Sequence, residues 1–75
     1  MTEIKKLEAV GAFYRRIHDL QEDGYYTLFA YADAKLYFYK LVHRNGNRVS
    51  LRLSLKDGKL SQSKNGKECY SATLL

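Results

Sequence analysis

The hydrophobic periodicity changes at Gly24, and this change constrains the fold more than any other feature of the 75-residue chain. Before Gly24, apolar residues recur every three or four positions, which is the repeat of a helix with one buried face. After Gly24, apolar and polar residues alternate, and Asn-Gly and Asp-Gly pairs interrupt the alternation, as in hairpin-connected strands. The sequence therefore predicts an α+β domain, with an N-terminal amphipathic helix packed on one face of a four- to five-stranded antiparallel meander sheet.

One domain spanning residues 1–75 is expected, with the helix over about 3–21 and the sheet over about 25–74. The predicted buried stripe of the helix comprises Ile4, Leu7, Val10, Phe13, Tyr14, Ile17, Leu20 and Gln21. Thr2 is the expected N-cap and Gly24 the expected stop. Gly11 lies in the middle of the helix, where glycine costs about 1 kcal/mol relative to alanine. We expect its missing side chain to let the helix lie close against the sheet.

The turn signals divide the rest of the chain into strands. The predicted strands are 25–31, 35–44, 48–56, 59–63 and 68–74. The predicted turns are 32–34, Asn45-Gly46, Asp57-Gly58 and Asn65-Gly66. Asn-Gly between alternating hydrophobic residues is the strongest short-range hairpin signal, so the central hairpin around Asn45-Gly46 carries most of the prediction.

The side chains of the central hairpin can be assigned to faces if Asn45-Gly46 is a two-residue turn. Arg44 then lies opposite Asn47, and directly opposed residues share a face. The expected core side contains Leu36, Phe38, Lys40, Val42, Val49, Leu51, Leu53 and Leu55, with Lys40 as a misfit. The expected opposite side contains Tyr37, Tyr39, Leu41, His43, Arg48, Ser50, Arg52 and Ser54.

A single helix cannot cover both faces of this sheet. A nineteen-residue helix is about 28 Å long and about 10 Å wide, whereas four or five strands span about 19–24 Å. Since the leucine-rich side needs the helix, the other side is left for water or a partner, and exposed aromatic surface usually marks an interaction site. The predicted binding face consists of Tyr37, Tyr39, His43, Arg48 and Arg52. Its predicted rim consists of Lys35, Arg44, Lys56 and Lys59.

The first hairpin has two possible registers, which depend on the loop at residues 32–34. A three-residue loop places Leu28 on the core face, opposite Phe38. A two- or four-residue loop exchanges the faces and buries Tyr25, Phe29 and Tyr31. The sequence does not choose between them.

The residues that carry chemistry are sparse, so no enzymatic activity and no cofactor are expected. Cys69 is the one cysteine, which excludes an intrachain disulfide and fits a reducing cytoplasm. It has no neighbouring base and is expected to be a small buried hydrophobic residue. Cys69 with His18 and His43 falls short of a zinc ligand set, so no metal is expected. Signal-peptide and membrane-spanning patterns are absent, which predicts a cytoplasmic protein with no membrane partner.

The charge distribution favours a polyanionic partner. Residues 1–24 carry four basic and five acidic residues, whereas residues 25–75 carry nine basic and three acidic residues. Aromatic rings on a sheet can stack bases while Arg and Lys neutralise phosphates, so the leading hypothesis is nucleic-acid binding, with single strands favoured. The alternative is a protein-interaction module, either a homodimer or a small inhibitor or adaptor of the phage or mobile-element type, since Tyr and Arg also dominate protein interfaces.

Overall fold

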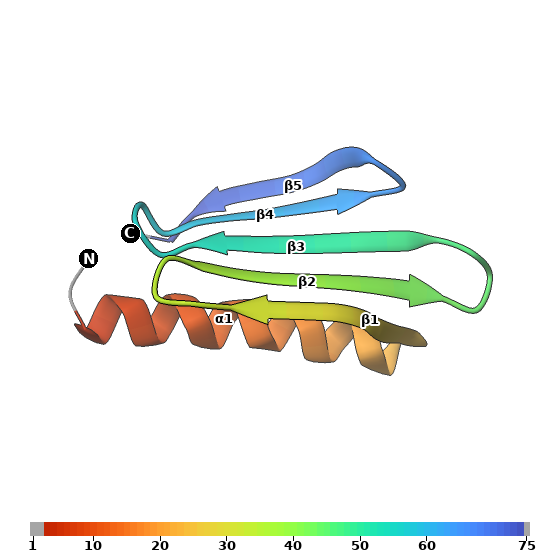
Figure 1. Cartoon of the computed structure of the whole chain (residues 1–75), viewed down its shortest axis with the longest axis horizontal. Coiled ribbons are helices and arrows are strands. Elements are labelled where there is room, and N and C mark those ends of the chain that lie inside the picture. Colours follow the sequence, from red (N-terminus) through yellow and green to blue (C-terminus); the bar gives the residue numbers. More distant parts are fainter. Residues whose placement is uncertain (1–2, 75) are drawn as a thin grey trace.

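The computed structural model describes residues 3–74 and has the predicted α+β architecture (Figure 1). One helix precedes five strands that form an antiparallel meander in the order β1-β2-β3-β4-β5. The elements are α1 (Glu3–Glu22), β1 (Tyr25–Ala32), β2 (Leu36–His43), β3 (Arg48–Ser54), β4 (Lys59–Lys64) and β5 (Lys67–Thr73). These bounds agree with the predicted ones to within two residues. The predicted N-cap, Thr2, lies outside the described residues.

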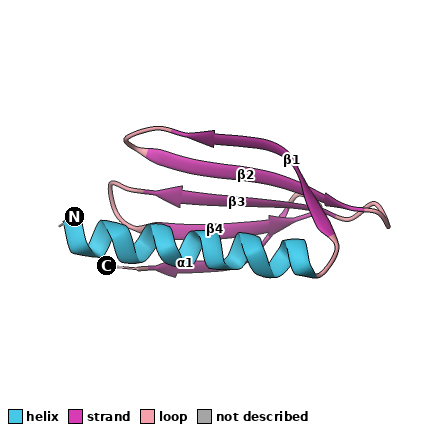
Figure 2. Cartoon of the chain, turned by 90° about the horizontal axis from the view of Figure 1, so that it is seen from below, coloured by secondary structure: helices cyan, strands magenta, loops and turns pink. Residues whose placement is uncertain are grey.

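The sheet curls around one side of α1, which lies roughly along the strands and contacts β1 and β3 (Figures 1 and 2). All five strands therefore share one face that turns toward the helix and one that turns away from it. The expectation that a single helix leaves one face of the sheet uncovered is confirmed.

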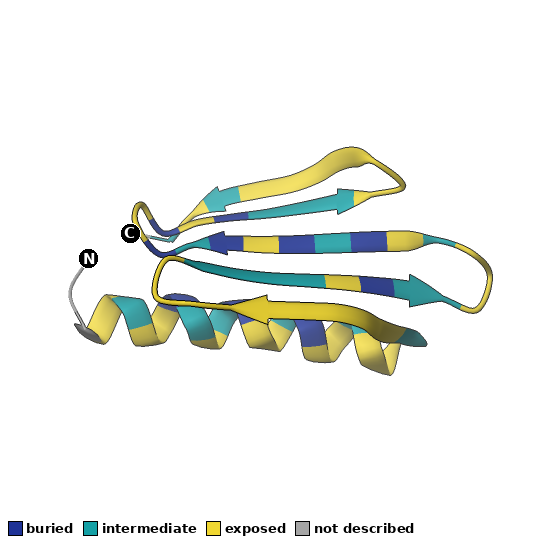
Figure 3. Ribbon diagram, in the orientation of Figure 1, coloured by how far each residue is buried: buried dark blue, intermediate teal, exposed yellow. Residues whose placement is uncertain are grey.

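The hydrophobic core lies between α1 and the central strands (Figure 3). The helix contributes Ala9, Phe13 and Ile17, which are spaced by one turn and are buried. The sheet and its turns contribute Leu41, Val49, Leu51, Leu53, Leu55 and Leu60. The alternating residues of β3 are thus buried as predicted.

The pairing of β2 with β3 differs from the prediction by one residue. Leu41 pairs with Val49 and Tyr39 with Leu51, whereas the predicted partner of Val49 was Val42. The turn has three residues, 44–46: the N–H of Gly46 donates to the His43 carbonyl, and the N–H of His43 donates to the Asn47 carbonyl. Gly46 takes the positive φ of 96° that such a three-residue turn requires at its last position.

This one-residue difference moves every β2 side chain to the other face. Leu41 is fully buried and Lys40 is exposed, so the structure avoids the lysine that the predicted register placed in the core. Burying an unpaired ammonium group is far more costly than exchanging one turn type for another. Three residues predicted in the core, Leu36, Phe38 and Val42, instead point away from the helix and are half-buried.

The first hairpin combines features of both predicted registers. Asp33 pairs with Leu36 across a two-residue turn, and Tyr31 lies opposite Phe38. Because Phe38 faces away from the helix, Tyr31 is exposed rather than buried. A β-bulge with Leu28 as the extra residue then shifts the register, so that Tyr25 turns back toward the core.

The buried stripe of α1 is rotated relative to the predicted one. Ile4 and Leu7 are 71% and 69% exposed, and the core is reached by Ala9, Phe13 and Ile17. Gly11 is also exposed, and a β-carbon added there would meet nothing within 4 Å. The prediction that Gly11 permits a close approach to the sheet is therefore wrong.

Within residues 3–74, no helix combines the length and apolar character needed to cross a membrane.

Cys69 is predicted to be buried, but the structure exposes it. It is the extra residue of a second bulge, between β4 and β5.

Candidate functional site

Tyr37 and Tyr39, the predicted centre of the binding face, lie on the helix side of the sheet. Their rings pack edge-to-face against Phe13, with centroids 6.0 and 5.7 Å away, and against Tyr14, at 6.0 and 5.8 Å. Both are half-buried against the core. The one-residue register shift removes them from the uncovered face, and their assignment to that face is wrong.

His43 also belongs to the helix side, where it closes the end of the molecule. Its Nδ1 accepts a hydrogen bond from the N–H of Asn45 at 3.1 Å, so Nε2 carries the proton and donates to the Asp23 carbonyl, also at 3.1 Å. The ring packs edge-to-face on Tyr25, with centroids 5.0 Å apart, and sits against Gly24. His43 therefore joins the helix end to the β2–β3 turn, and it does not belong to the uncovered face.

We call the surface turned away from α1 the open face and define it from the strand pairing. Its residues are Tyr26, Phe29, Tyr31, Leu36, Phe38, Lys40, Val42, Arg48, Ser50, Arg52, Ser54, Lys59, Ser61, Ser63, Glu68, Ser71 and Thr73. This set retains Arg48, Arg52 and Lys59 from the prediction.

Aromatic side chains gather on the β1–β2 half of the open face. Tyr26, Phe29 and Tyr31 of β1 are 55%, 53% and 46% exposed, and half-buried Phe38 lies beside them on β2. The rings of Phe29 and Phe38 are tilted, with centroids 6.2 Å apart. Since strand residues two apart share a face and the bulge adds one residue, the three β1 rings form a row along the sheet edge.

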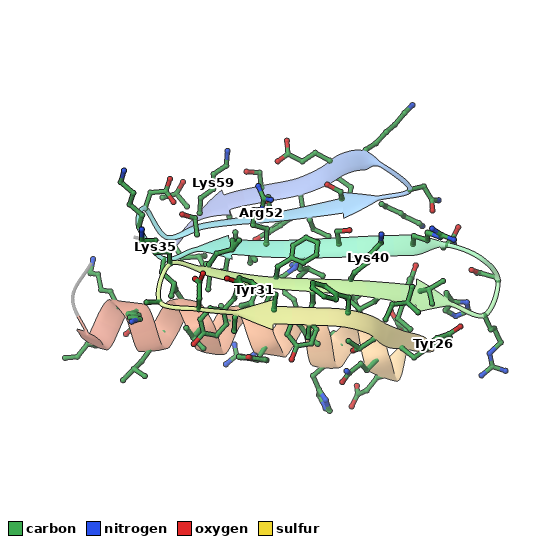
Figure 4. The ribbon with its side chains drawn as sticks, viewed as in Figure 1. Tyr26, Tyr31, Lys35, Lys40, Arg52 and Lys59 are labelled. Atoms are coloured by element: carbon green, nitrogen blue, oxygen red, sulfur yellow. The ribbon has the colours of Figure 1, made fainter. Side chains whose placement is uncertain are left out.

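Basic side chains border this aromatic row. Lys40 of β2 lies opposite Phe29, and Arg52 of β3 lies opposite Phe38. Both are exposed, as are Arg48 and Lys59 farther along the face. Figure 4 shows Tyr26, Tyr31, Lys40, Arg52 and Lys59 distributed over the strands from β1 to β4. Neighbouring strands are about 4.8 Å apart, so cationic groups lie within one or two strand spacings of the rings.

Hydroxyl groups line the remaining part of the open face. They belong to Ser50, Ser54, Ser61, Ser63, Ser71 and Thr73, on β3, β4 and β5. Glu68 is the acidic residue among the strand residues of this face. These short side chains do not project far from the sheet, and their hydroxyl groups can form hydrogen bonds beside the cations.

The predicted rim residues are exposed, but they are spread over both ends of the sheet. Lys35 lies in the β1–β2 turn, and Lys56 lies in the β3–β4 turn. Figure 4 shows Lys35 at the end of the sheet that carries the β3–β4 turn. Arg44 lies in the β2–β3 turn at the opposite end. Lys59 is on the open face itself, paired with Ser54.

A hydrogen-bonded turn fixes the end of the aromatic row. The Tyr31 hydroxyl donates to Asp33 Oδ2 at 2.7 Å, while the N–H groups of Lys35 and Leu36 donate to Oδ1 at 2.7 and 2.8 Å. These three bonds lower the pKa of Asp33, with the Tyr31 hydroxyl as the largest cause. The same bond, followed by the negative charge of Asp33, raises the pKa of Tyr31. The hydrogen bond to Asp33 thus holds the Tyr31 ring in place at the end of the row.

The metal-ligating side chains lie apart in the part of the chain that the structure describes. Within residues 3–74, no group of three His, Cys, Asp or Glu side chains could hold a metal ion. His18 and Glu22 form a pair one helical turn apart, at 3.2 Å, and both are largely exposed.

Sequence reasoning misses the aromatic residues of the open face, because the turn signal alone predicts a β2–β3 register that differs by one residue from the observed one. The sequence did contain the corrective signal, since Lys40 was a misfit in the predicted core. Moving Lys40 outward brings Phe38 and Val42 with it and draws Tyr37, Tyr39 and Leu41 inward. Phe29 and Tyr31 then face outward with Phe38, because they pair with β2 across the two-residue β1–β2 turn. Tyr26 could not have been placed in this way, because its facing depends on a bulge at Leu28 that has no turn signal.

No protein-family model matches the chain, and comparisons with curated proteins and with solved structures likewise find no match.

Proposed function

We propose that the protein is a small, non-enzymatic cytoplasmic protein that binds single-stranded nucleic acid on its open face. The observation that carries the proposal is the row formed by Tyr26, Phe29 and Tyr31, about half exposed and bordered by Lys40 and Arg52. A contiguous group of exposed rings usually marks an interaction site.

The aromatic row suits unpaired bases. Bases in a single strand can splay apart and stack on aromatic rings, whereas bases in a duplex already stack on each other. Each base stacked on a ring contributes about 1–3 kcal/mol, and it does so with little dependence on sequence. The row lies along one strand, so successive rings could receive successive bases.

The cations suit the backbone of the same strand. Lys40 and Arg52 lie next to the rings, and Arg48 and Lys59 lie farther along the same face. The serine hydroxyls around them can donate to phosphate oxygens. Glu68 is on β5, at the far edge from the aromatic row. The bases would therefore lie over β1 and β2, and the phosphates over β3 and β4.

Fluorescence anisotropy with labelled single- and double-stranded oligonucleotides, measured over a salt series, tests the proposal. We expect tighter binding to the single strand and a linear fall of log K with log salt concentration, because each neutralised phosphate contributes about −0.7 to the slope. A failure to bind either oligonucleotide at low salt would refute the proposed function.

Matched substitutions locate the face. Tyr31→Leu should weaken binding about 5- to 150-fold, which corresponds to about 1–3 kcal/mol of lost stacking. Lys59→Ala should reduce the salt slope by about 0.7. The controls are Tyr70→Leu and Lys64→Ala, since Tyr70 and Lys64 are exposed but lie on the helix side of the sheet. Equal effects of test and control variants would show that the open face is not the binding site.

The same experiment separates the alternative function, a protein-interaction module. A protein interface built on tyrosines should depend weakly on salt, whereas phosphate contacts are strongly salt-dependent. Weak oligonucleotide binding without a salt slope would favour a protein partner on the open face.

A further inference from the structure

Each ring of the aromatic row shares a line across the sheet with one cation. Phe29 pairs directly with its cation, whereas each of the other two rings is joined to its cation through one residue of β2. The ring–cation pairs are Tyr26 with Arg48, Phe29 with Lys40, and Tyr31 with Arg52. The three rings are about half exposed and the three cations are exposed, so both kinds of group are accessible on every line.

The three lines are evenly spaced along the sheet. Adjacent lines are about 6.8 Å apart, because the β2 partners of the rings are two residues apart and an antiparallel strand rises about 3.4 Å per residue. The bulge at Leu28 makes the three-residue step from Tyr26 to Phe29 span the same length of β2 as the two-residue step from Phe29 to Tyr31. Ring and cation thus repeat together at one interval.

This interval is about twice the distance between stacked bases. A helical strand rises about 3.4 Å per nucleotide, so a stacked strand would bring only every second base to a ring and about two phosphates to each cation. A strand extended to about 6.8 Å per nucleotide brings one base to each ring and one phosphate to each cation. Charge complementarity therefore favours the extended strand, in which neighbouring bases no longer touch.

The row has a defined length. Tyr26 is the first residue of β1 on the open face, and beyond Tyr31 the next β1 position on this face is taken by Asp33, which pairs with Leu36. This fourth line carries Lys59, through the pairing of Leu36 with Ser54, but it has no ring on β1. It can contact a further phosphate but cannot stack a further base.

We infer that the open face binds an extended, pyrimidine-rich single strand and stacks three successive bases of it, one on each line. The inference rests on the proposed function and specifies its ligand. Every base can stack on an aromatic ring, so the rings themselves discriminate little. The selectivity arises from the free strand, because adenine runs stack strongly on themselves and pyrimidine runs stack weakly, so a pyrimidine strand loses less when its bases separate.

Fluorescence anisotropy at low salt, with labelled oligo(dT) and oligo(dA) of equal length, tests the ligand class. We expect oligo(dT) to bind about tenfold more tightly, and this ratio to fall on warming, because heat unstacks free oligo(dA) before it binds. Equal or tighter binding of oligo(dA) would overturn the inference and leave the proposed function standing. Failure to bind either oligonucleotide would refute both.

Competition against labelled oligo(dT) measures the number of stacked bases. The competitors are the thymidine di-, tri- and tetranucleotides, each with a 5′-phosphate so that every nucleotide brings one phosphate. The third nucleotide should tighten binding about 5- to 150-fold, because it adds one stacked base. The gain from the fourth should be smaller and should disappear as salt rises, because it comes from Lys59 alone. A fourth nucleotide that tightens binding as much as the third, at every salt concentration, would overturn the inference.

Substitutions in the row test the assignment of one base to each line. Tyr26→Leu should abolish the gain from the di- to the trinucleotide and leave dinucleotide binding nearly unchanged, because Phe29 and Tyr31 remain adjacent. Phe29→Leu removes the middle ring and should weaken binding of both competitors. The control Tyr70→Leu, on the helix side of the sheet, should weaken neither. Thermal unfolding of each variant verifies the fold, and identical effects of Tyr26→Leu and Phe29→Leu would contradict the assignment.

Discussion

At the scale of single residues, the aromatic row depends on the carboxylate of Asp33. This exposed side chain joins the Tyr31 hydroxyl to the N–H groups of Lys35 and Leu36 and so closes the β1–β2 turn. Charged acceptors make stronger hydrogen bonds than neutral ones, which is why the pKa of Asp33 is lowered. The turn and the orientation of Tyr31 are therefore controlled by one side chain.

Acid should weaken this turn. The lowered pKa of Asp33 means that its contribution to stability is present above its unfolded pKa and is lost as pH falls through its folded pKa. The raised pKa of Tyr31 has the opposite sense, so its contribution is lost as alkaline pH rises through its folded pKa.

Urea unfolding across the acidic range checks the contribution of Asp33. Asp33→Ala should lower stability near neutral pH and flatten its acid dependence. Asp33→Asn keeps an acceptor oxygen without the charge, so it should recover part of the stability but not the acid dependence. The residual acid dependence belongs in part to Asp57, whose pKa is lowered mainly by the N–H of Lys59. An unchanged profile in Asp33→Ala would contradict this account.

Gly24 is a second residue with a specific requirement. Its φ is +104°, and a β-carbon there would lie 2.7 Å from Nε2 of His43, the atom that bonds the Asp23 carbonyl. Gly24→Ala should destabilise the protein by about 1–3 kcal/mol through backbone strain and displacement of the imidazole. Gly11→Ala is the matched control, since Gly11 is helical and unobstructed, and it should gain about 1 kcal/mol. Equal losses in urea unfolding would refute the distinction.

At the scale of elements, the two Asn-Gly pairs form different turns. Asn65 and Gly66 both have positive φ, 52° and 86°, and connect Lys64 to Lys67 as a two-residue turn. In the central hairpin Gly46 alone has positive φ, and the turn contains three residues. The same dipeptide thus fits two registers that differ by one residue.

Alanine substitutions should distinguish the two turns. Asn65→Ala forces alanine into a left-handed conformation and removes the bond that Asn65 Oδ1 accepts from the Arg48 N–H, so it should cost about 1–2 kcal/mol or more. Asn45→Ala removes one exposed hydrogen bond in the turn, which Asn45 Oδ1 accepts from the N–H of Asn47. This change should cost less than about 1 kcal/mol. Thermal unfolding measures both. A larger loss for Asn45→Ala would indicate that the central turn also needs a left-handed asparagine.

At the scale of the whole molecule, the position of the helix determines which face of the sheet is buried. Two tyrosines and one leucine of β2 pack under α1, while Phe38 and Lys40 remain on the open face. The long side chain of Arg16 extends this cover toward the sheet edge. It donates to Gln62 at 2.8 Å and lies 3.9 Å above the Tyr70 ring.

The assignment of the two faces can be tested at neighbouring positions of β2. Leu41→Ala should cost about 2–5 kcal/mol, because Leu41 is fully buried. That is a large part of the roughly 4–11 kcal/mol expected for a domain of this length. Lys40→Ala, at an exposed position, should change stability by no more than about 0.5 kcal/mol. The predicted register demands the reverse order, so urea unfolding of these two variants discriminates between the registers.

The sequence by itself determined the helix, the five strands and the positions of the turns, because periodicity and turn residues are local properties of the chain. It also determined that one face of the sheet stays uncovered, since a single helix is too narrow to shield both. The tertiary structure decided which side chains occupy that face. A shift of one residue at the Arg44–Gly46 turn and a bulge at Leu28 cost little locally, and the choice was made by burying Leu41 and exposing Lys40.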